Sequence, residues 1–154
     1  MSLVIQMIER ALDIQGYPGS EFLGFTNMIA GDFLNLHPSV LKFPFEPKKR
    51  SSCSLQLANK TDQFVAFKTL TTNTHKSIFN PNNGIILPRS ICNVTVTIEK
   101  QNEAPPNMQC EYKFKVLAVM APNGATKNDI TTSMFDKKNN VVEELKLSAV
   151  YIPV

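Results

Sequence analysis

The sequence contains few of the residues from which metal sites and redox sites are built. It has only 3 cysteines and 2 histidines in 154 residues. Cys53, Cys92 and Cys110 are widely spaced, form no Cys-x-x-Cys pair, and are not accompanied by histidines at the spacing of a zinc site. We therefore expect reduced thiols that are buried as small apolar side chains, with no metal and no cofactor.

The motifs of common enzyme classes are also missing. There is no Gly-x-Ser-x-Gly elbow, no His-Glu-x-x-His helix and no glycine-rich phosphate loop, and 6 glycines leave little material for such a loop. His37 lies beside a proline and His75 follows a Thr-Asn-Thr segment, so neither has a recognisable catalytic partner. The sequence predicts a protein that is not an enzyme.

Strong net charge and long apolar runs are absent as well. The 16 Lys and Arg residues nearly balance the 13 Asp and Glu residues, which gives a net charge of +3, far from the basic excess of a dedicated nucleic-acid-binding protein. No segment approaches the roughly 20 consecutive apolar residues that cross a bilayer, and no signal peptide is recognisable. We expect a cytoplasmic chain without a transmembrane segment and without a nucleic-acid partner.

What the sequence does contain is enough apolar material for one domain, with 43% hydrophobic residues. Between Leu3 and Ile14, apolar residues recur at intervals of three and four, which predicts an amphipathic helix that ends at Gly16. A connector without periodicity follows. We therefore divide the chain into an N-terminal extension, 1–31, and a domain, 32–154.

The domain has the alternation of short β-strands separated by turns. In 52–59 and 90–98, apolar and polar residues alternate, as in half-buried antiparallel strands. Similar segments are 64–71, 112–120 and 144–151, and 35–45 adds one or two strands interrupted by prolines. Six or seven strands predict an all-β, immunoglobulin-like sandwich. The residues 131–135 predict one helical turn before the last strand.

This alternation predicts which side chains form the core. The expected inward set is Cys53, Leu55, Leu57, Val65, Phe67, Thr69, Cys92, Val94, Val96, Ile98, Phe114, Val116, Ala118, Leu145, Leu147 and Ala149.

The same alternation brings several lysines to one outer surface. The third and sixth strands of such a sandwich are neighbours, so their outward side chains lie together. A positive surface with apolar gaps suits an extended acidic peptide with an aromatic anchor, although lysines on a sheet face can also serve only for solubility. The expected outward set is Ala66, Lys68, Leu70, Lys113, Lys115 and Leu117.

Short motifs in a fixed order run through the domain. They include Leu41-Lys42-Phe43-Pro44-Phe45, Leu57-x-Asn59-Lys60-Thr61-Asp62, Val65-Ala66-Phe67-Lys68, Asn80-Pro81-Asn82-x-Gly84-Ile85-Ile86 and Glu103-Ala104-Pro105-Pro106-x-Met108-Gln109-Cys110. In this order the motifs, spread over 34–151, resemble the major sperm protein (MSP) domain of the VAMP-associated protein (VAP) family, particularly its plant members.

The resemblance implies a fold and a function. Domains of this family are seven-stranded, immunoglobulin-like (PapD-like) sandwiches that bind FFAT motifs, which are peptides with two phenylalanines in an acidic tract. They recruit partner proteins to contact sites of the endoplasmic reticulum and act in vesicle trafficking. By position, the resemblance implies that the peptide is bound by Lys68, Thr71, Thr72, Asn82 and Lys113.

Two positions on the same surface depart from the family pattern. Leu70 stands where the family commonly has a second lysine, and Lys115 stands where it has Met or Leu. Lys115 places a charge where the phenylalanine pocket has an apolar wall, which is costly unless the ammonium reaches solvent. We expect weaker binding of ordinary FFAT peptides or a preference for more acidic or phosphorylated ones; a copy that has lost peptide binding is the alternative.

A further alternative is a structural protein that self-assembles, as nematode major sperm protein does, which would make the chain a weak homo-oligomer. Family members typically continue into a coiled coil and a membrane anchor, whereas this sequence ends at Val154. We expect any association with the endoplasmic reticulum to be peripheral.

Overall fold

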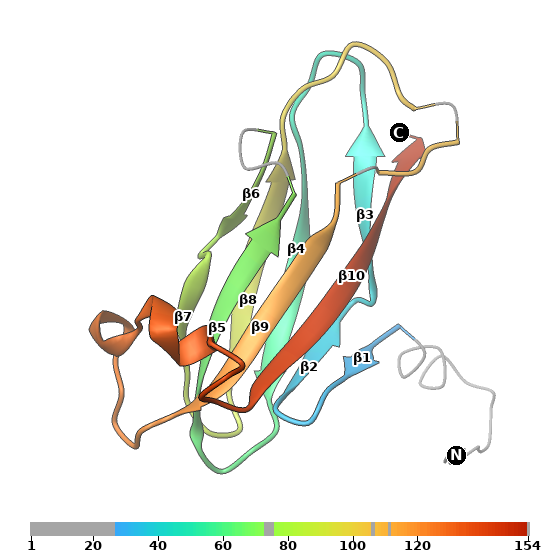
Figure 1. The fold of residues 1–154 in the computed structure, drawn as a ribbon. Coiled ribbons are helices and arrows are strands. Elements are labelled where there is room, and N and C mark those ends of the chain that lie inside the picture. Colours follow the sequence, from blue (N-terminus) through green and yellow to red (C-terminus); the bar gives the residue numbers. More distant parts are fainter. Residues whose placement is uncertain (1–26, 73–75, 106, 111, 154) are drawn as a thin grey trace, which may run out of the picture.

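The computed structural model describes residues 27–72, 76–105, 107–110 and 112–153. In this part of the chain ten strands form two five-stranded sheets that pack face to face (Figure 1). The back sheet has the order β1 (Ile29–Ala30), β2 (Leu34–His37), β4 (Ser51–Asn59), β8 (Ile91–Ile98), β6 (Ser77–Asn80). The front sheet has the order β3 (Val40–Phe45), β10 (Val142–Pro153), β9 (Phe114–Ala121), β5 (Phe64–Thr71), β7 (Asn83–Ile86).

The predicted all-β sandwich is confirmed, but the number of strands exceeds the six or seven expected. Pro38 has no backbone N–H and separates β2 from β3, which then join opposite sheets. The strands β6 and β7 have four residues each and flank a turn, and β1 has two. Segments this short do not show a period in the sequence, which is why they were not predicted.

The core lies between the two sheets and consists of the side chains that the alternation predicts to face inward. All of them are buried or pack half-buried against the core. Aromatic rings join the layers: Phe114 of β9 lies 6.2 Å from Phe43 and 5.8 Å from Phe79 between ring centroids. Each fully buried side chain of this size contributes about 1.5–3 kcal/mol, so inward burial fixes the orientation of the strands.

Two side chains that were predicted to be exposed on the front sheet are instead buried. Ala66 is 0% exposed and Leu117 is 8% exposed. Ala66 belongs to a second apolar cluster, which Met134 and Phe135 pack against. These two residues are in η2 (Thr132–Phe135), the predicted helical turn, which follows η1 (Lys127–Asp129). The segment 122–140 therefore covers one end of the outer face of the front sheet.

Asn59 ties together the loops at one end of the sandwich. It is only 2% exposed, and its Nδ2 donates to the carbonyl oxygens of Gln63 (2.8 Å), Ile86 (3.0 Å) and Leu87 (3.0 Å). Its Oδ1 accepts from the backbone N–H of Thr61 at 2.9 Å and from its hydroxyl at 2.8 Å. One amide on β4 therefore satisfies polar groups of the β4–β5 loop and of the end of β7, as buried backbone groups require.

Glu143 connects the last strand to the first ones. Its carboxylate accepts from the backbone N–H groups of Asp32, Phe33 (3.1 Å) and Leu34 (3.1 Å) at the start of β2. Gly31 lies directly against this carboxylate, so that an added Cβ would come within 2.6 Å of its atoms. Residues 29–30, which the sequence assigns to the N-terminal extension, form β1 at the edge of this region.

The helix predicted for the first 14 residues lies outside the described part of the chain. Among the described residues, no helix has the length and apolar character needed to span a bilayer.

The Asn59 network predicts a large loss of stability for Asn59→Ala. The substitution leaves three carbonyl oxygens of the loops without their donor, so we expect the free energy of unfolding to fall by about 3 kcal/mol. Asn93→Ala, at an exposed position of β8, is the matched control and should change it by less than about 0.5 kcal/mol. Urea unfolding followed by circular dichroism measures both, and equal effects of the two substitutions would contradict the role of the network.

Candidate functional site

The lysines that the sequence predicts to cluster do lie together, on the outer face of the front sheet. Lys68 and Leu70 are on β5, while Lys113 immediately precedes β9, which carries Lys115. In the register of these two strands, Leu70 lies opposite Lys115, and Lys68 lies opposite Leu117. Residues opposite one another on one face are close enough for their side chains to interact.

A further lysine, Lys146 of β10, lies directly opposite Lys115. It is exposed and alternates with the inward Leu145 and Leu147, so it points to the same outer face. Neither the periodicity nor the family resemblance pointed to it, because the interpretation of the sequence placed only the third and sixth strands side by side. The name lysine face is used below for Lys68, Leu70, Lys113, Lys115 and Lys146.

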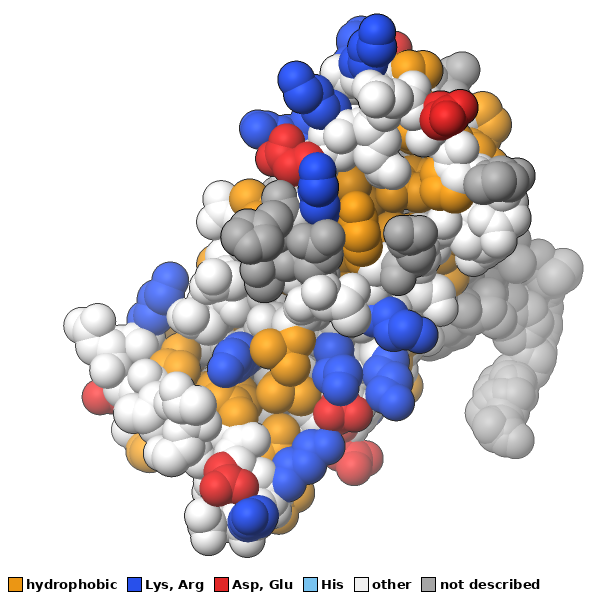
Figure 2. All heavy atoms as spheres, turned by 45° about the horizontal axis from the view of Figure 1, so that its top comes forward, with side chains coloured by type: hydrophobic (Ala, Val, Ile, Leu, Met, Phe, Trp, Pro, Cys, Tyr) orange, Lys and Arg blue, Asp and Glu red, His pale blue; other side chains and the backbone are white. Residues whose placement is uncertain are grey.

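Figure 2 shows this side of the molecule, with lysine and arginine side chains grouped around hydrophobic ones over the front sheet. Leu70, at 37% exposure, is an apolar residue of this group that solvent reaches. A hollow of about 420 Å³ lies along β9 and β10, beside three lysines of this group, and is lined by Gln109, Cys110, Tyr112, Lys113, Phe114, Lys115, Lys146, Leu147, Ser148 and Ala149. The surface therefore combines positive charge with an accessible apolar side chain and a concave neighbourhood.

Thr71 and Thr72, both predicted to bind the peptide, are placed differently. Thr72 is exposed beside Lys113, whose backbone N–H donates to the Thr72 hydroxyl at 3.0 Å, while the Thr72 N–H donates to the Lys113 carbonyl at 3.2 Å. Thr71 has the inward register, opposite Phe114, and its hydroxyl is hydrogen-bonded to that of Ser77 at 2.7 Å. The structure thus brings Thr72 to the edge of the lysine face and turns Thr71 toward β6.

Asn82 lies in the turn between β6 and β7, close to Lys68. Its carbonyl oxygen accepts from the backbone N–H of Thr69 at 2.9 Å and from the Thr69 hydroxyl at 3.0 Å. The next residue, Asn83, lies opposite Lys68 in the sheet. The exposed Asn82 side chain therefore borders the lysine face on the β7 side, where polar groups of an extended ligand could be bound.

The ammonium group of Lys115 is paired with a carboxylate of the protein. Its Nζ lies 3.3 Å from Oε2 of Glu144 on β10, and the same oxygen lies 3.1 Å from Nζ of Lys137. Hydrogen bonds from Lys137 and Lys115 hold the pKa of Glu144 below its usual range, so this carboxylate is ionised at neutral pH. The Lys115 ammonium, with a side chain 36% exposed, therefore has a partner at the surface and is not buried alone.

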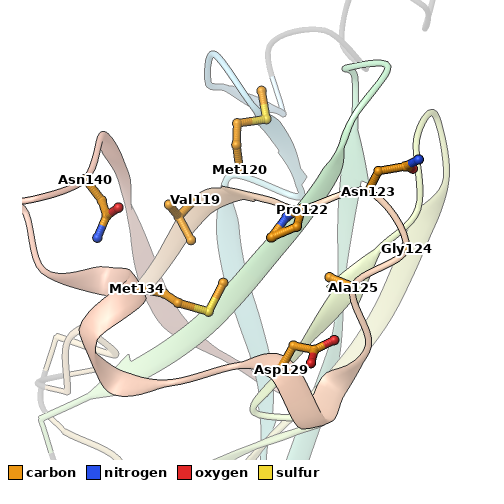
Figure 3. A pocket seen from close by; sticks show the side chains of 9 residues that line it. All are labelled: Val119, Met120, Pro122, Asn123, Gly124, Ala125, Asp129, Met134 and Asn140. Carbon is orange, nitrogen blue, oxygen red and sulfur yellow. The ribbon is translucent and has the colours of Figure 1, made fainter.

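A larger hollow, of about 530 Å³, lies where β9 runs into the segment 122–140 (Figure 3). Val119 and Met134 point toward one another across it, whereas Met120 points away. The carboxylate of Asp129 is engaged in accepting from the backbone N–H of Thr126 at 2.7 Å. None of the predicted site residues lines this hollow, and its residues do not combine a nucleophile with a base.

Cys53, Cys92 and Cys110 are half-buried and are not joined by disulfides. Burial raises the pKa of Cys53 to about 12, against a smaller opposing effect of a hydrogen bond with the Lys42 backbone, and burial also raises the pKa of Cys92. A thiol with a raised pKa is a poor nucleophile and a poor metal ligand. Within the described residues, no group of three or more His, Cys, Asp or Glu is arranged to hold a metal ion.

Comparison with known proteins identifies the relatives of this chain. A sequence model of the MSP (major sperm protein) domain matches residues 34–141. Vesicle-associated protein 1-3 of Arabidopsis thaliana is 52% identical over 82% of this chain and 54% of its own length, and vesicle-associated protein 3-1 of the same plant is 47% identical over 81% of this chain and 85% of its own length. The chain spans about half the length of several of these relatives.

Among solved structures, WR4, an MSP family member of Caenorhabditis elegans, superimposes with a TM-score of 0.58 over 79% of this chain and 100% of its own. The two sequences are 15% identical, so this similarity concerns the fold.

The raised pKa of Cys53 predicts that this thiol resists alkylation in the folded protein. At pH 8 a thiol with a pKa of about 12 is ionised to only about 1 part in 10⁴, and the thiolate is the reactive form. We expect iodoacetamide to label Cys53 at least about 100-fold more slowly in native buffer than in 8 M urea, as measured by mass spectrometry of its peptide. Labelling at similar rates in both conditions would show that the thiol is accessible and ionisable.

Proposed function

This chain belongs to the MSP domain family, with the Arabidopsis vesicle-associated proteins of the VAP family among its relatives, and on that premise we propose that it is a non-enzymatic module that binds short acidic, FFAT-like peptide segments of partner proteins on the lysine face. The observation that carries the proposal is that Lys68, Lys115 and Lys146 on three neighbouring strands, and Lys113 directly before β9, share one outer face with the exposed Leu70. We also propose that it is recruited to cytoplasmic membrane surfaces of the endoplasmic reticulum or of vesicles; the names of the relatives, vesicle-associated proteins, support the association with vesicles.

The free energy that the lysines can contribute to binding shows that the ligand needs more than acidic groups. Exposed ion pairs contribute about 0.2–1 kcal/mol each, so four lysines supply at most about 4 kcal/mol. Micromolar binding requires about 8 kcal/mol. The remainder must come from apolar contact and main-chain hydrogen bonds, and a buried phenylalanine ring contributes about 1.5–3 kcal/mol. The fitting ligand is therefore an extended peptide that carries both carboxylates and aromatic side chains.

The two departures from the family pattern fit this proposal. Leu70 gives an aromatic side chain an apolar contact between Lys68 and Lys115, whose aliphatic stems can border it. The ammonium of Lys115 is drawn toward Glu144, so its charge is compensated beside such a contact. In this proposal the hollow along β9 and β10 receives the rest of the peptide.

The proposal predicts that charge reversal on the lysine face abolishes peptide binding. We expect a fluorescent peptide with two phenylalanines in an acidic tract to bind the wild type with micromolar affinity, and the Lys68→Asp, Lys113→Asp double variant to bind at least tenfold more weakly, since two attractions become repulsions. Fluorescence anisotropy at about 0.1 M salt, where the Debye length is about 10 Å, measures both.

The matched control is the Lys48→Asp, Lys49→Asp double variant, which makes the same change of charge in the exposed turn between β3 and β4. It should bind within about threefold of the wild type, because this turn is not part of the lysine face. Equal losses in the two double variants would mean that only net charge matters, and no binding by the wild type would refute the proposed function.

A further inference from the structure

Among the described residues, Glu144 is the acidic residue that forms a salt bridge with the lysine face. It lies on β10 opposite Leu117 and diagonally next to Lys115, and it alternates with the inward Leu145, so its side chain points to the outer face. The Oε2 atom contacts the ammonium groups of both Lys115 and Lys137, at 3.3 and 3.1 Å. The Glu144 side chain is 26% exposed, so a ligand on that face can reach it.

The other lysines of the face differ from Lys115 in this respect. In the described part of the chain, Lys68, Lys113 and Lys146 have no carboxylate within salt-bridge distance. Among the lysines of this face, Lys115 is the one whose charge is neutralised by a carboxylate of the described residues, although Lys146 lies directly opposite it. A ligand carboxylate that approached Lys115 would meet the negative charge of Glu144 and would have to displace it, and like charges at such distances repel.

We propose that Glu144 is a specificity-determining residue that competes with the ligand for Lys115. Its carboxylate is tethered beside the ammonium, so it acts at a high effective concentration, whereas an acidic group of the ligand arrives from solution. The acidic groups of the ligand are therefore bound by Lys68, Lys113 and Lys146, and an uncharged side chain of the ligand lies next to Lys115. This inference rests on the proposed function and adds which lysine the ligand does not use.

The geometry also gives Lys137 a part in this competition. Lys137 lies in the segment 122–140 and shares the Glu144 oxygen with Lys115, so it stabilises the ionised form of the competitor. Removal of Glu144 releases Lys115, whereas removal of Lys137 leaves Glu144 with Lys115 as its remaining partner.

Glu144→Gln tests the inference. This variant keeps the shape of the side chain and removes its charge, and we expect it to bind the acidic peptide of the preceding section about three- to tenfold more tightly than the wild type. In a Lys115→Met background the same change should improve binding by less than about twofold, because the released lysine is absent. Glu46→Gln, at a glutamate paired with Lys49 in the β3–β4 turn, is the matched control for the lost charge and should leave affinity within about twofold.

The outcomes separate this inference from the proposed function. If the wild type binds and Glu144→Gln binds no better, or gains as much in the Lys115→Met background, the competition is refuted while the proposed function stands. If neither the wild type nor any variant binds, both are refuted. Lys137→Met, which keeps Glu144, should not tighten binding; a gain equal to that of Glu144→Gln would refute the specific role of the carboxylate. Equal melting temperatures by circular dichroism confirm that the variants are folded.

Discussion

The outer surface of the front sheet depends on one constraint, the burial of every second side chain of β5, β9 and β10. Phe67, Val116 and Leu147 face the core between the sheets, and the two-residue period then turns the lysines outward. A shift of the register by one residue would bury ammonium groups and expose the core, at a cost of several kcal/mol for each unpaired charge. The lysine face is therefore as firmly placed as the core behind it, although its own contacts contribute little to stability.

The same constraint explains how much of the fold could be predicted from the sequence. The long strands β4, β5, β8, β9 and β10 show their alternation clearly, so their inward side chains were predicted correctly. The short strands β1, β6 and β7 have no measurable period and were missed. Ala66 and Leu117 were placed on an exposed face by their register alone. Whether another segment covers such a face is a property of tertiary packing, as the cover of residues 122–140 over Ala66 shows.

The candidate site, like the fold, was predictable only where its residues lie on long strands. The proximity of Leu70 and Lys115 follows from pairing the third strand with the sixth, which the structure contains as β5 and β9. The positions of Thr72 and Asn82 are set by loops, where periodicity gives no information, and only the family resemblance pointed to them. Lys146 and Glu144 were missed because the periodicity of a strand does not reveal its neighbours, and therefore does not place β10 beside β9. The interaction that neutralises Lys115 therefore emerges only from the sheet order.

The pairing of β3 with β10 has a mechanical consequence. The two strands run parallel over six residue pairs, from Val40 with Ser148 to Phe45 with Pro153. The chain enters β3 at one end of this ladder and leaves β10 at the other, so tension between the two sides of the domain loads the ladder along the strands. Its hydrogen bonds then resist in shear, all at once, whereas a hairpin pulled from its open end gives way one bond after another. A domain built in this way resists tension applied at the two ends of this ladder without opening its sheet.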